Sequence, residues 1–389
     1  RDQPRSRGLG DVYKRQDFDK ACDANLTELK RIGADGTQNV IFSPYLLGTQ
    51  WLSKAALPGQ ELGDDDMWQI KEFENMQFED YEKIKEMGWD AFQKQLKYII
   101  DIKIRGNNVI EKLYAENMPA PCLSVVTNDC ISNAKDYNAG GARYNTNYIQ
   151  GVGIGTVTDC ITAVKYNVFD KKNFTMEELL EAMDHNFEGY DAIFRMVHDK
   201  TPKYGNDDDY ADSIMQDVFN LYHDLITGRP TMRGGKYGVD MLPTTCHVYF
   251  GEVIGATANG RKANVPVSEG ISPEKSADTN GPTAVIKSCS KMDHLATAGT
   301  LLNQKFTPDV VAGEKGLENM SSLIRSYFAM DGHHIQFNVI DRQTLIEAQK
   351  HPDDYRDLIV RVAGYSDFFR NLSKPLQDEI INRTEQSFE

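Results

Sequence analysis

The hydrophobic and polar positions follow a helical period in the middle of the chain. Residues 175–198 (TMEELLEAMDHNFEGYDAIFRMVH) and 210–228 (YADSIMQDVFNLYHDLITG) both place apolar side chains three and four positions apart, which predicts helices. Thr175 is followed three residues later by Glu178, the spacing of a capping box. The first helix is therefore expected to begin directly after Thr175.

A weaker helical pattern precedes these two segments. Phe92, Leu96 and Ile99 recur at helical spacing, and the pattern resumes beyond Gly106, where we expect a break. The short apolar run at 122–126 (CLSVV) predicts a buried strand instead.

Near the C-terminus, strand and helix patterns alternate. Residues 334–341 (HIQFNVID) and 357–364 (DLIVRVAG) have the character of strands, and 343–351 (QTLIEAQKH) between them that of a helix. A strand, a helix and a second strand in this order favour a parallel βαβ unit. Together with the helices upstream, this alternation predicts an α/β fold.

Composition excludes two classes of partner. The 389 residues are 40% hydrophobic and carry a net charge of −15, whereas a protein that binds duplex nucleic acid needs clustered Lys and Arg. No stretch approaches the roughly 20 apolar residues that span a bilayer. We expect neither nucleic acid nor membrane as a partner. Residues 1–16 (RDQPRSRGLGDVYKRQ) have no apolar period and are expected to be a non-native leader.

The six cysteines are scattered and form no CxxC pair, so we expect reduced thiols and no metal site. They are Cys22, Cys122, Cys130, Cys160, Cys246 and Cys289. If Cys246 and His247 were neighbours on a strand, their side chains would point to opposite faces, which disfavours a thiolate–imidazole pair.

Two motifs resemble ligand sites but also have ordinary structural explanations. Residues 151–156 (GVGIGT) approach a dinucleotide-binding loop, but Thr156 stands at the place of the last glycine and the preceding residues suggest polar loop rather than strand. Asp208, Asp209 and Asp212 would suit Mg²⁺ on a helix face. The favoured explanation is that these carboxylates lie at a helix N-terminus, where the helix dipole stabilises negative charge.

Gly364 stands where the apolar strand pattern of 358–363 ends. The ordinary explanation is a backbone position that needs a positive φ, which glycine adopts at no steric cost. The chemical explanation concerns its Cα, which has no side chain. Loss of one hydrogen would leave a radical centre between an amide nitrogen and a carbonyl, and a Cβ would crowd the plane that lets both neighbours delocalise the electron.

The segment 360–369 (VRVAGYSDFF) resembles the signature of the glycyl radical enzymes of the pyruvate formate-lyase-like family. Further segments that resemble this family are 140–159, 207–212, 242–252, 259–288 and 291–306, and the resemblance covers about residues 78–389. Within the family, 200–212 (KTPKYGNDDDYAD) and 358–367 (LIVRVAGYSD) are similar to the dehydratases that act on trans-4-hydroxy-L-proline.

The resemblance implies the second half of a ten-stranded α/β barrel of the glycyl radical type. Residues 17–262 would be the C-terminal part of the barrel domain, and residues 269–389 the glycine radical domain, with Gly364 as the radical site. Thr244 would contact substrate at a strand end, although a strand Thr satisfied by backbone explains it equally well.

The family's chemistry implies no bound cofactor. A separate activating enzyme, which uses S-adenosylmethionine and an iron–sulfur cluster, would remove a hydrogen from Gly364. The glycyl radical would oxidise a cysteine, whose thiyl radical takes hydrogen from C5 of the amino-acid substrate. Hydroxide then leaves C4 with the assistance of an acid, so that water is lost and 1-pyrroline-5-carboxylate forms. The resemblance also implies a homodimer and, because oxygen cleaves such a radical protein, an anaerobic cytoplasm.

One departure from the family pattern limits this expectation. The reactive cysteine should be followed two residues later by a glutamate, near Gly33, and none of the six cysteines has that neighbour. We therefore expect a C-terminal fragment that has no turnover alone. A glycerol or diol dehydratase and a non-catalytic spare-part radical subunit remain the alternatives.

Overall fold

The computed structural model describes residues 39–41, 81–242 and 245–388. The chain divides into two compact units, which are described separately. One contains Gln95–Ile149 and Asp224–Gly238, and the other contains Gln150–His223 and residues 239–388.

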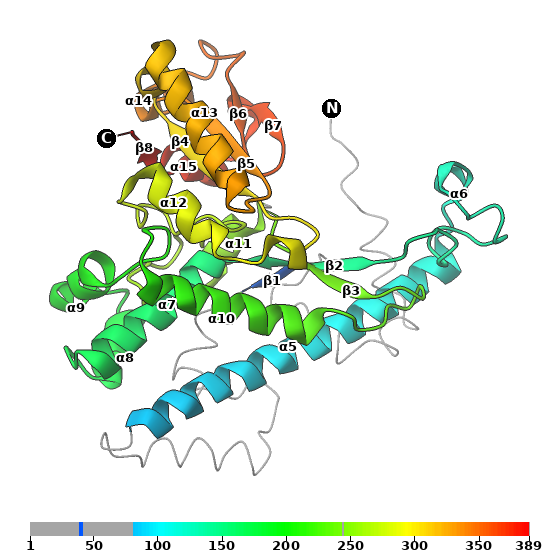
Figure 1. Ribbon diagram of the computed structural model, residues 1–389, viewed down its shortest axis with the longest axis horizontal. Coiled ribbons are helices and arrows are strands. Elements are labelled where there is room, and N and C mark those ends of the chain that lie inside the picture. Colours follow the sequence, from blue (N-terminus) through cyan, green and yellow to red (C-terminus); the bar gives the residue numbers. More distant parts are fainter. Residues whose placement is uncertain (1–38, 42–80, 243–244, 389) are drawn as a thin grey trace. The chain divides into compact units, whose positions relative to one another are not determined.

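Helices and strands alternate along the described residues, so the α/β class is confirmed (Figure 1). The helices are α5 (Tyr81–Asn117), α6 (Pro121–Val126), α7 (Ile154–Val164), α8 (Met176–Asp184), α9 (Asp191–Arg195), α10 (Asp209–Ile226), α11 (Cys246–Val253), α12 (Gly281–Ser290), α13 (Gly313–Ala329), α14 (Arg342–Lys350) and α15 (Lys374–Ile381). The strands are β1 (Asn39–Ile41), β2 (Asn147–Val152), β3 (Tyr237–Asp240), β4 (Leu302–Phe306), β5 (Ile335–Val339), β6 (Ile359–Arg361), β7 (Ser366–Phe368) and β8 (Glu385–Gln386).

The second predicted helix in the middle of the chain is confirmed, whereas residues 175–198 form α8, α9 and the π-helix Met196–Lys200 instead of one continuous helix. α8 begins after Thr175, whose side chain accepts a hydrogen bond from the backbone N–H of Glu178, while the Glu178 carboxylate accepts one from the Thr175 N–H. α10 covers the second predicted segment. The break expected at Gly106 is wrong, because α5 runs through it. Burial of Ile102 and Ile104 outweighs the cost of about 1 kcal/mol for a glycine inside a helix.

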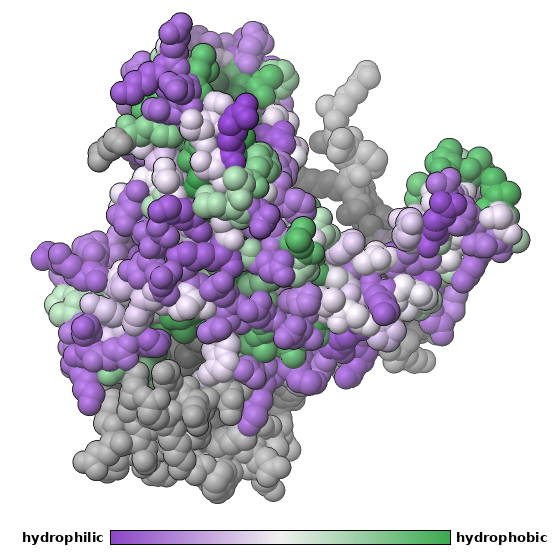
Figure 2. Space-filling model, in the orientation of Figure 1, coloured by the Kyte–Doolittle hydropathy of each residue, from purple (hydrophilic) through white to green (hydrophobic). Residues whose placement is uncertain are grey.

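Three short apolar runs are helices. The segment 122–126, predicted as a buried strand, belongs to α6, which begins with Pro121 at its first turn, a position that proline favours. Its Val125 and Val126 are exposed, and Figure 2 shows a hydrophobic patch over α6. The runs at 247–256 and 283–289 fall largely in α11 and α12.

The parallel βαβ unit exists, but one element earlier than predicted. β4 and β5 pair in parallel, with Leu302 opposite Ile335, and α13 connects them. β8 lies on the other side of β4, which gives the order β5-β4-β8. β6 instead pairs antiparallel with β7. The Asn338 side chain takes the place of a strand partner, since its Oδ1 accepts from the Arg361 N–H and its Nδ2 donates to the Arg361 carbonyl, both at 2.8 Å.

A hydrophobic core in the second unit anchors the β6–β7 hairpin. Val360 and Val362 are buried together with Leu345 of α14 and Ile380 of α15. In Figure 1 the yellow-to-red part of the chain gathers α13, α14, α15 and the strands β4 to β8. No helix among the described residues is long and apolar enough to cross a membrane.

Candidate functional site

Gly364 lies in the turn that connects β6 to β7. Val362 donates its N–H to the carbonyl of Tyr365 at 2.8 Å, so Ala363 and Gly364 are the two central residues of the turn. Gly364 has φ +81°, which strains any residue with a Cβ and suits glycine at the second central position of a type II turn. The ordinary explanation of this glycine therefore holds as a statement about conformation.

The surroundings of Gly364 are open. Among the residues that the structure describes, a Cβ built on Gly364 would meet no atom within 4 Å, and the residue is exposed. Ala363 and Val362 directly before it are buried. The backbone therefore passes within two residues from a packed core to a Cα that a reaction partner can reach. Such a Cα is suited to exchange a hydrogen atom with another molecule or with another segment of a longer protein.

The Arg361 side chain spans the hairpin. Its Nε donates to Gln336 Oε1 at 2.7 Å, its Nη1 to Ser366 Oγ at 3.2 Å, and its Nη2 to the carbonyl of Gly364 at 3.2 Å. The guanidinium thus connects β5, β7 and the turn. These hydrogen bonds fix the orientation of the peptide group that follows the Gly364 Cα.

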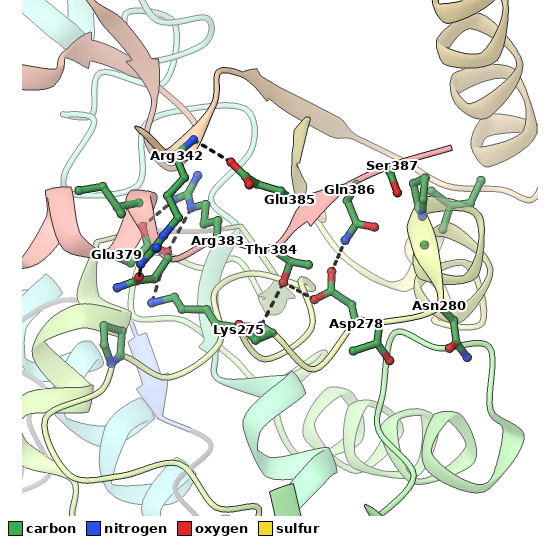
Figure 3. A pocket seen from close by; sticks show the side chains of 18 of the residues that line it. Lys275, Asp278, Asn280, Arg342, Glu379, Arg383, Thr384, Glu385, Gln386 and Ser387 are labelled. Atoms are coloured by element: carbon green, nitrogen blue, oxygen red, sulfur yellow. Dashed lines mark hydrogen bonds and ion pairs between the residues drawn. The ribbon is translucent and has the colours of Figure 1, made fainter. Parts of the chain in front are cut away.

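Below the hairpin lies a buried ionic cluster, which consists of His247, Lys275, Glu379 and Arg383 (Figure 3 labels the last three). Glu379 has a fully buried side chain and pairs with Arg383 at 2.9 Å and with Lys275 and His247 at 3.5 Å. Burial alone would raise the pKa of Glu379, but the charges of Arg383 and Lys275 outweigh it and hold this pKa well below its usual value. The carboxylate therefore stays ionised at neutral pH.

Arg383 links this cluster to the hairpin. Its Nη2 donates to the carbonyl of Val362 at 2.7 Å, and its Nη1 to that of Arg361 at 3.2 Å. The two carbonyls directly before the turn are therefore held by a guanidinium whose own position is fixed by Glu379. Charged hydrogen bonds of this kind are stronger than neutral ones.

A polar groove of about 1860 Å³ borders the ionic cluster. Figure 3 shows Asp278 at its wall, where the carboxylate accepts hydrogen bonds from Thr384 and Gln386. Burial raises the pKa of Asp278 to about 6. At the opposite side, Arg342 donates its N–H to Glu385 at 2.8 Å. Both acidic and basic side chains line the groove, so its charge favours neither an anionic nor a cationic ligand.

The remaining predicted site residues are placed as follows. Thr244 and Cys22 lie outside the described residues, so the structure does not describe their surroundings. Cys130, Cys160 and Cys289 are buried, and Cys122 is exposed. Cys246 and His247 are on α11 rather than on a strand, and His247 is buried in the ionic cluster.

The acidic run at the start of α10 is partly neutralised by two lysines, Lys287 and Lys291. Lys291 lies 2.7 Å from both Asp209 and Asp212 and 3.2 Å from Asp207. Ser288 donates a further hydrogen bond to Asp212 at 2.9 Å. Among the residues that the structure describes, no group of three or more His, Cys, Asp or Glu could hold a metal ion. The favoured explanation, negative groups at a helix N-terminus, agrees with this arrangement.

The glycine-rich segment 151–156 was expected to follow polar loop, but it follows a strand. β2 (Asn147–Val152) includes Gly151 and alternates partly between buried and exposed positions, as a strand does. α7 begins at Ile154, directly after Gly153, which has φ +91°. Gly155 nevertheless serves packing, since a Cβ there would lie 2.9 Å from the carbonyl oxygen of Ser272. The space beside Gly155 is therefore filled by the protein's own backbone, and no room is left there for a phosphate.

Family models match most of the described chain. The model for pyruvate formate lyase-like proteins matches residues 59–251, and the model for the glycine radical domain matches residues 267–370, which include Gly364 and Arg361. The chain belongs to the glycyl radical enzyme family. Its resemblance to this family and the α/β barrel class are thereby confirmed.

Relatives with known activities extend the comparison. The chain is 68% identical over 311 residues to trans-4-hydroxy-L-proline dehydratase of Clostridioides difficile. The aligned region covers 80% of this chain and 39% of that relative. It is 39% identical to (2S)-3-sulfopropanediol dehydratase of Klebsiella oxytoca, over 77% of this chain and 37% of the relative. The chain thus spans less than two fifths of the length of these curated relatives.

Solved structures agree. The crystal structure of hydroxyproline dehydratase from Clostridioides difficile with trans-4-hydroxy-L-proline bound superposes with a TM-score of 0.80 at 62% identity, covering 89% of this chain and 43% of that one. The glycerol-bound glycerol dehydratase of Clostridium butyricum also gives 0.80, at 37% identity, covering 90% of this chain and 43% of that one.

The sequence pattern draws attention to Gly364 but not to the residues that hold its turn. Arg361 belongs to the segment that resembles the family signature, whereas no motif marks Glu379 or Arg383. Their spacing of four residues was a visible signal for an ion pair on a helix end. The pair's burial and its contact with the hairpin had no such signal.

Proposed function

We propose that this chain is the C-terminal part of a glycyl radical dehydratase and that Gly364 stores the radical. The observation that carries the proposal is a glycine at φ +81° within the segment that matches the glycine radical domain, in a turn whose flanking backbone is held by Arg361 and Arg383. Residues 17–262 would be the barrel part and 269–389 the radical domain, a division that we propose from the sequence.

The chemistry of Gly364 follows from its lack of a side chain. When one hydrogen atom leaves the Cα, the unpaired electron spreads onto the preceding amide nitrogen and the following carbonyl if all three lie in one plane. Any other residue would place a Cβ against that plane, and at φ +81° the Cβ would add backbone strain. An activating enzyme that uses S-adenosylmethionine and an iron–sulfur cluster is the partner that we propose for this step.

The proposed substrate is trans-4-hydroxy-L-proline. Support comes from the 68% identity to a dehydratase of that name and from the solved relative with this amino acid bound. Loss of water from it would give 1-pyrroline-5-carboxylate. Thr244 remains a predicted substrate contact. We also propose a homodimer and, because oxygen reacts with carbon radicals, an oxygen-free cytoplasm.

Turnover needs residues that this chain does not supply. None of its six cysteines is followed by a glutamate two positions later, the pair that the family's thiyl chemistry requires. We therefore expect that the chain, incubated with trans-4-hydroxy-L-proline, forms no product even when Gly364 carries a radical.

Electron paramagnetic resonance tests the radical. The chain is treated under anaerobic conditions with the activating enzyme of a hydroxyproline dehydratase, and a doublet from the single remaining Cα hydrogen is expected. Growth on deuterated glycine should collapse the doublet, and Gly364→Ala should abolish it. Gly313→Ala is the matched control, since Gly313 also has a positive φ and no atom within 4 Å of its Cβ position. A signal that survives Gly364→Ala would refute the proposal.

The alternative is a spare-part subunit that lends its radical to a damaged enzyme. The combination of a radical glycine with a missing Cys-x-Glu pair favours it. The chain would be mixed with a hydroxyproline dehydratase that oxygen has cleaved at its radical glycine, and activated again. Recovered dehydration that depends on Gly364 would support this second function. No recovery, with a normal Gly364 signal, would leave the fragment explanation alone.

A further inference from the structure

The carbonyl of Gly364 has an unusual partner for an exposed turn. It accepts a hydrogen bond from the Arg361 guanidinium at 3.2 Å, whereas turn carbonyls at a surface are ordinarily solvated. The other two acceptors of this guanidinium, Gln336 Oε1 and Ser366 Oγ, are neutral. No acceptor among these three therefore cancels its positive charge, and the Gly364 carbonyl receives a charged donor.

The Arg361 side chain is itself held from two sides. Gln336 lies on β5 and is buried, so the short bond of 2.7 Å to Nε anchors the guanidinium to the parallel sheet. The Arg361 backbone is fixed at the same time by Asn338, two residues further along β5, and by Arg383 of the ionic cluster. Arg361 is therefore a rigid connection from β5 and the ionic cluster to the turn.

We propose that Arg361 is a positioning residue that stabilises the Gly364 radical through its carbonyl. This inference rests on the proposed function and deepens it. In such a radical the amide nitrogen donates electron density and the carbonyl withdraws it. A positive donor on the carbonyl oxygen increases the withdrawal and holds the carbonyl in the plane of the Cα. Both effects weaken the Cα–H bond of Gly364 and lengthen the life of the radical.

The first experiment examines the hydrogen bond without any radical. The full chain is labelled with ¹³C at the glycine carbonyls, and the Gly364 resonance is assigned by its loss in Gly364→Ala. Arg361→Gln should move this resonance upfield, because the carbonyl loses its charged donor. The matched control is Arg356→Gln, since the Arg356 guanidinium is exposed and contacts Asp353. An unchanged Gly364 resonance in Arg361→Gln would overturn the inference.

The second experiment measures the radical. After anaerobic activation as above, the radical in Arg361→Gln should decay roughly tenfold faster than in the unmodified chain, as expected for the loss of one charged hydrogen bond. The splitting by the remaining Cα hydrogen should also change, because the spin density on the Cα changes. Arg361→Lys keeps the charge and should recover part of the lifetime, while Arg356→Gln should behave as the unmodified chain.

The outcomes separate the inference from the proposed function. If the unmodified chain gives no glycine-centred signal, the proposed function fails and the carbonyl resonance alone decides whether Arg361 holds Gly364. If all chains give the same splitting and the same decay, Gly364 stores a radical and the inference about Arg361 is wrong. A change of stability in Arg361→Gln would alter neither the splitting nor the partial recovery in Arg361→Lys.

Discussion

The β6–β7 hairpin is packed loosely at its tip, around Gly364, and tightly at its base, where Glu379 and Arg383 lie. At the tip, no atom of the described part of the chain lies within 4 Å of the position where Gly364 would carry a Cβ. At the base, Glu379 is completely buried and has three cationic or titratable neighbours, of which Arg383 holds the backbone before the turn. The contacts in the described residues therefore hold the backbone on either side of Gly364, and its Cα itself is not packed.

The difference between tip and base explains how Gly364 can be exposed while the backbone around it has a defined conformation. An exposed loop without such hydrogen bonds is usually more mobile than the elements that it connects. A glycine inside a packed core, in turn, is not accessible to a reaction partner. Here the carbonyls of Arg361, Val362 and Gly364 each accept a guanidinium hydrogen bond, while no described atom lies within 4 Å of the Cβ position of Gly364. This arrangement presents one backbone atom in a defined orientation to a partner.

The largest effect is expected at the base. Glu379→Ala leaves Arg383 and Lys275 buried without their counter-charge, so the free energy of unfolding should fall by about 3–5 kcal/mol, measured by urea denaturation. Glu347→Ala is the control, because Glu347 pairs with Lys350 on the surface, and a change within about 0.5 kcal/mol is expected there. Equal effects of the two substitutions would break the comparison between tip and base.

A second buried carboxylate lacks such a guanidinium partner. Burial raises the pKa of Asp159 from 3.8 to about 7, against the opposing charge of Lys203 and the Tyr204 N–H bond. The folded protein holds this proton at pH values where the unfolded chain has lost it. The contribution of Asp159 to the free energy of unfolding is therefore greatest below pH 4 and falls as the pH rises toward 7, by roughly 3–4 kcal/mol.

Asp159→Asn tests this pH dependence, since the amide oxygen can still accept from Tyr204. The variant should gain stability relative to the unmodified chain as the pH rises from 4 to 7, measured by urea denaturation at several pH values. A difference between the two chains that does not change with pH would show that Asp159 is ionised in the folded state, as Glu379 is.

Gly205 has almost the same φ as Gly364 but is packed. A Cβ there would lie 2.3 Å from Cγ of Pro273, in addition to the strain of φ +95°. Gly205→Ala should therefore destabilise the protein by about 2–3 kcal/mol. A thermal or urea unfolding curve that coincides with that of the unmodified chain would mean that the backbone near Pro273 moves freely.

The smallest effect on stability is expected at the tip. Gly364→Ala should cost about 1 kcal/mol, the conformational cost of a positive φ without any clash, and Gly313→Ala should cost the same. Urea denaturation of both variants checks this. A much larger loss at Gly364 than at Gly313 would mean that the tip is packed in the folded protein, and that loss of the radical in Gly364→Ala could follow from unfolding.

The sequence predicted those elements whose signals are local. The capping box placed the start of α8, and the apolar periods located α10 and α14. The same approach misassigned 122–126, because six residues with an apolar run fit a strand or a short helix equally well and Pro121 favours the helix. It also placed the βαβ crossover one element late, since β6 is only three residues long and its partner is β7.

By itself, the sequence determined the family and singled out Gly364 as the proposed radical site, because the segment around it is a run of adjacent residues and the proposed chemistry needs only a missing side chain. Only the tertiary structure decided what holds that glycine. His247, Lys275 and the Glu379–Arg383 pair come from three segments far apart in the chain. The charges of Lys275, Glu379 and Arg383 interact strongly because folding removes them from water. The hydrogen bond from Arg361 to Gly364 likewise exists because a two-residue turn brings the side chain back over its own strand.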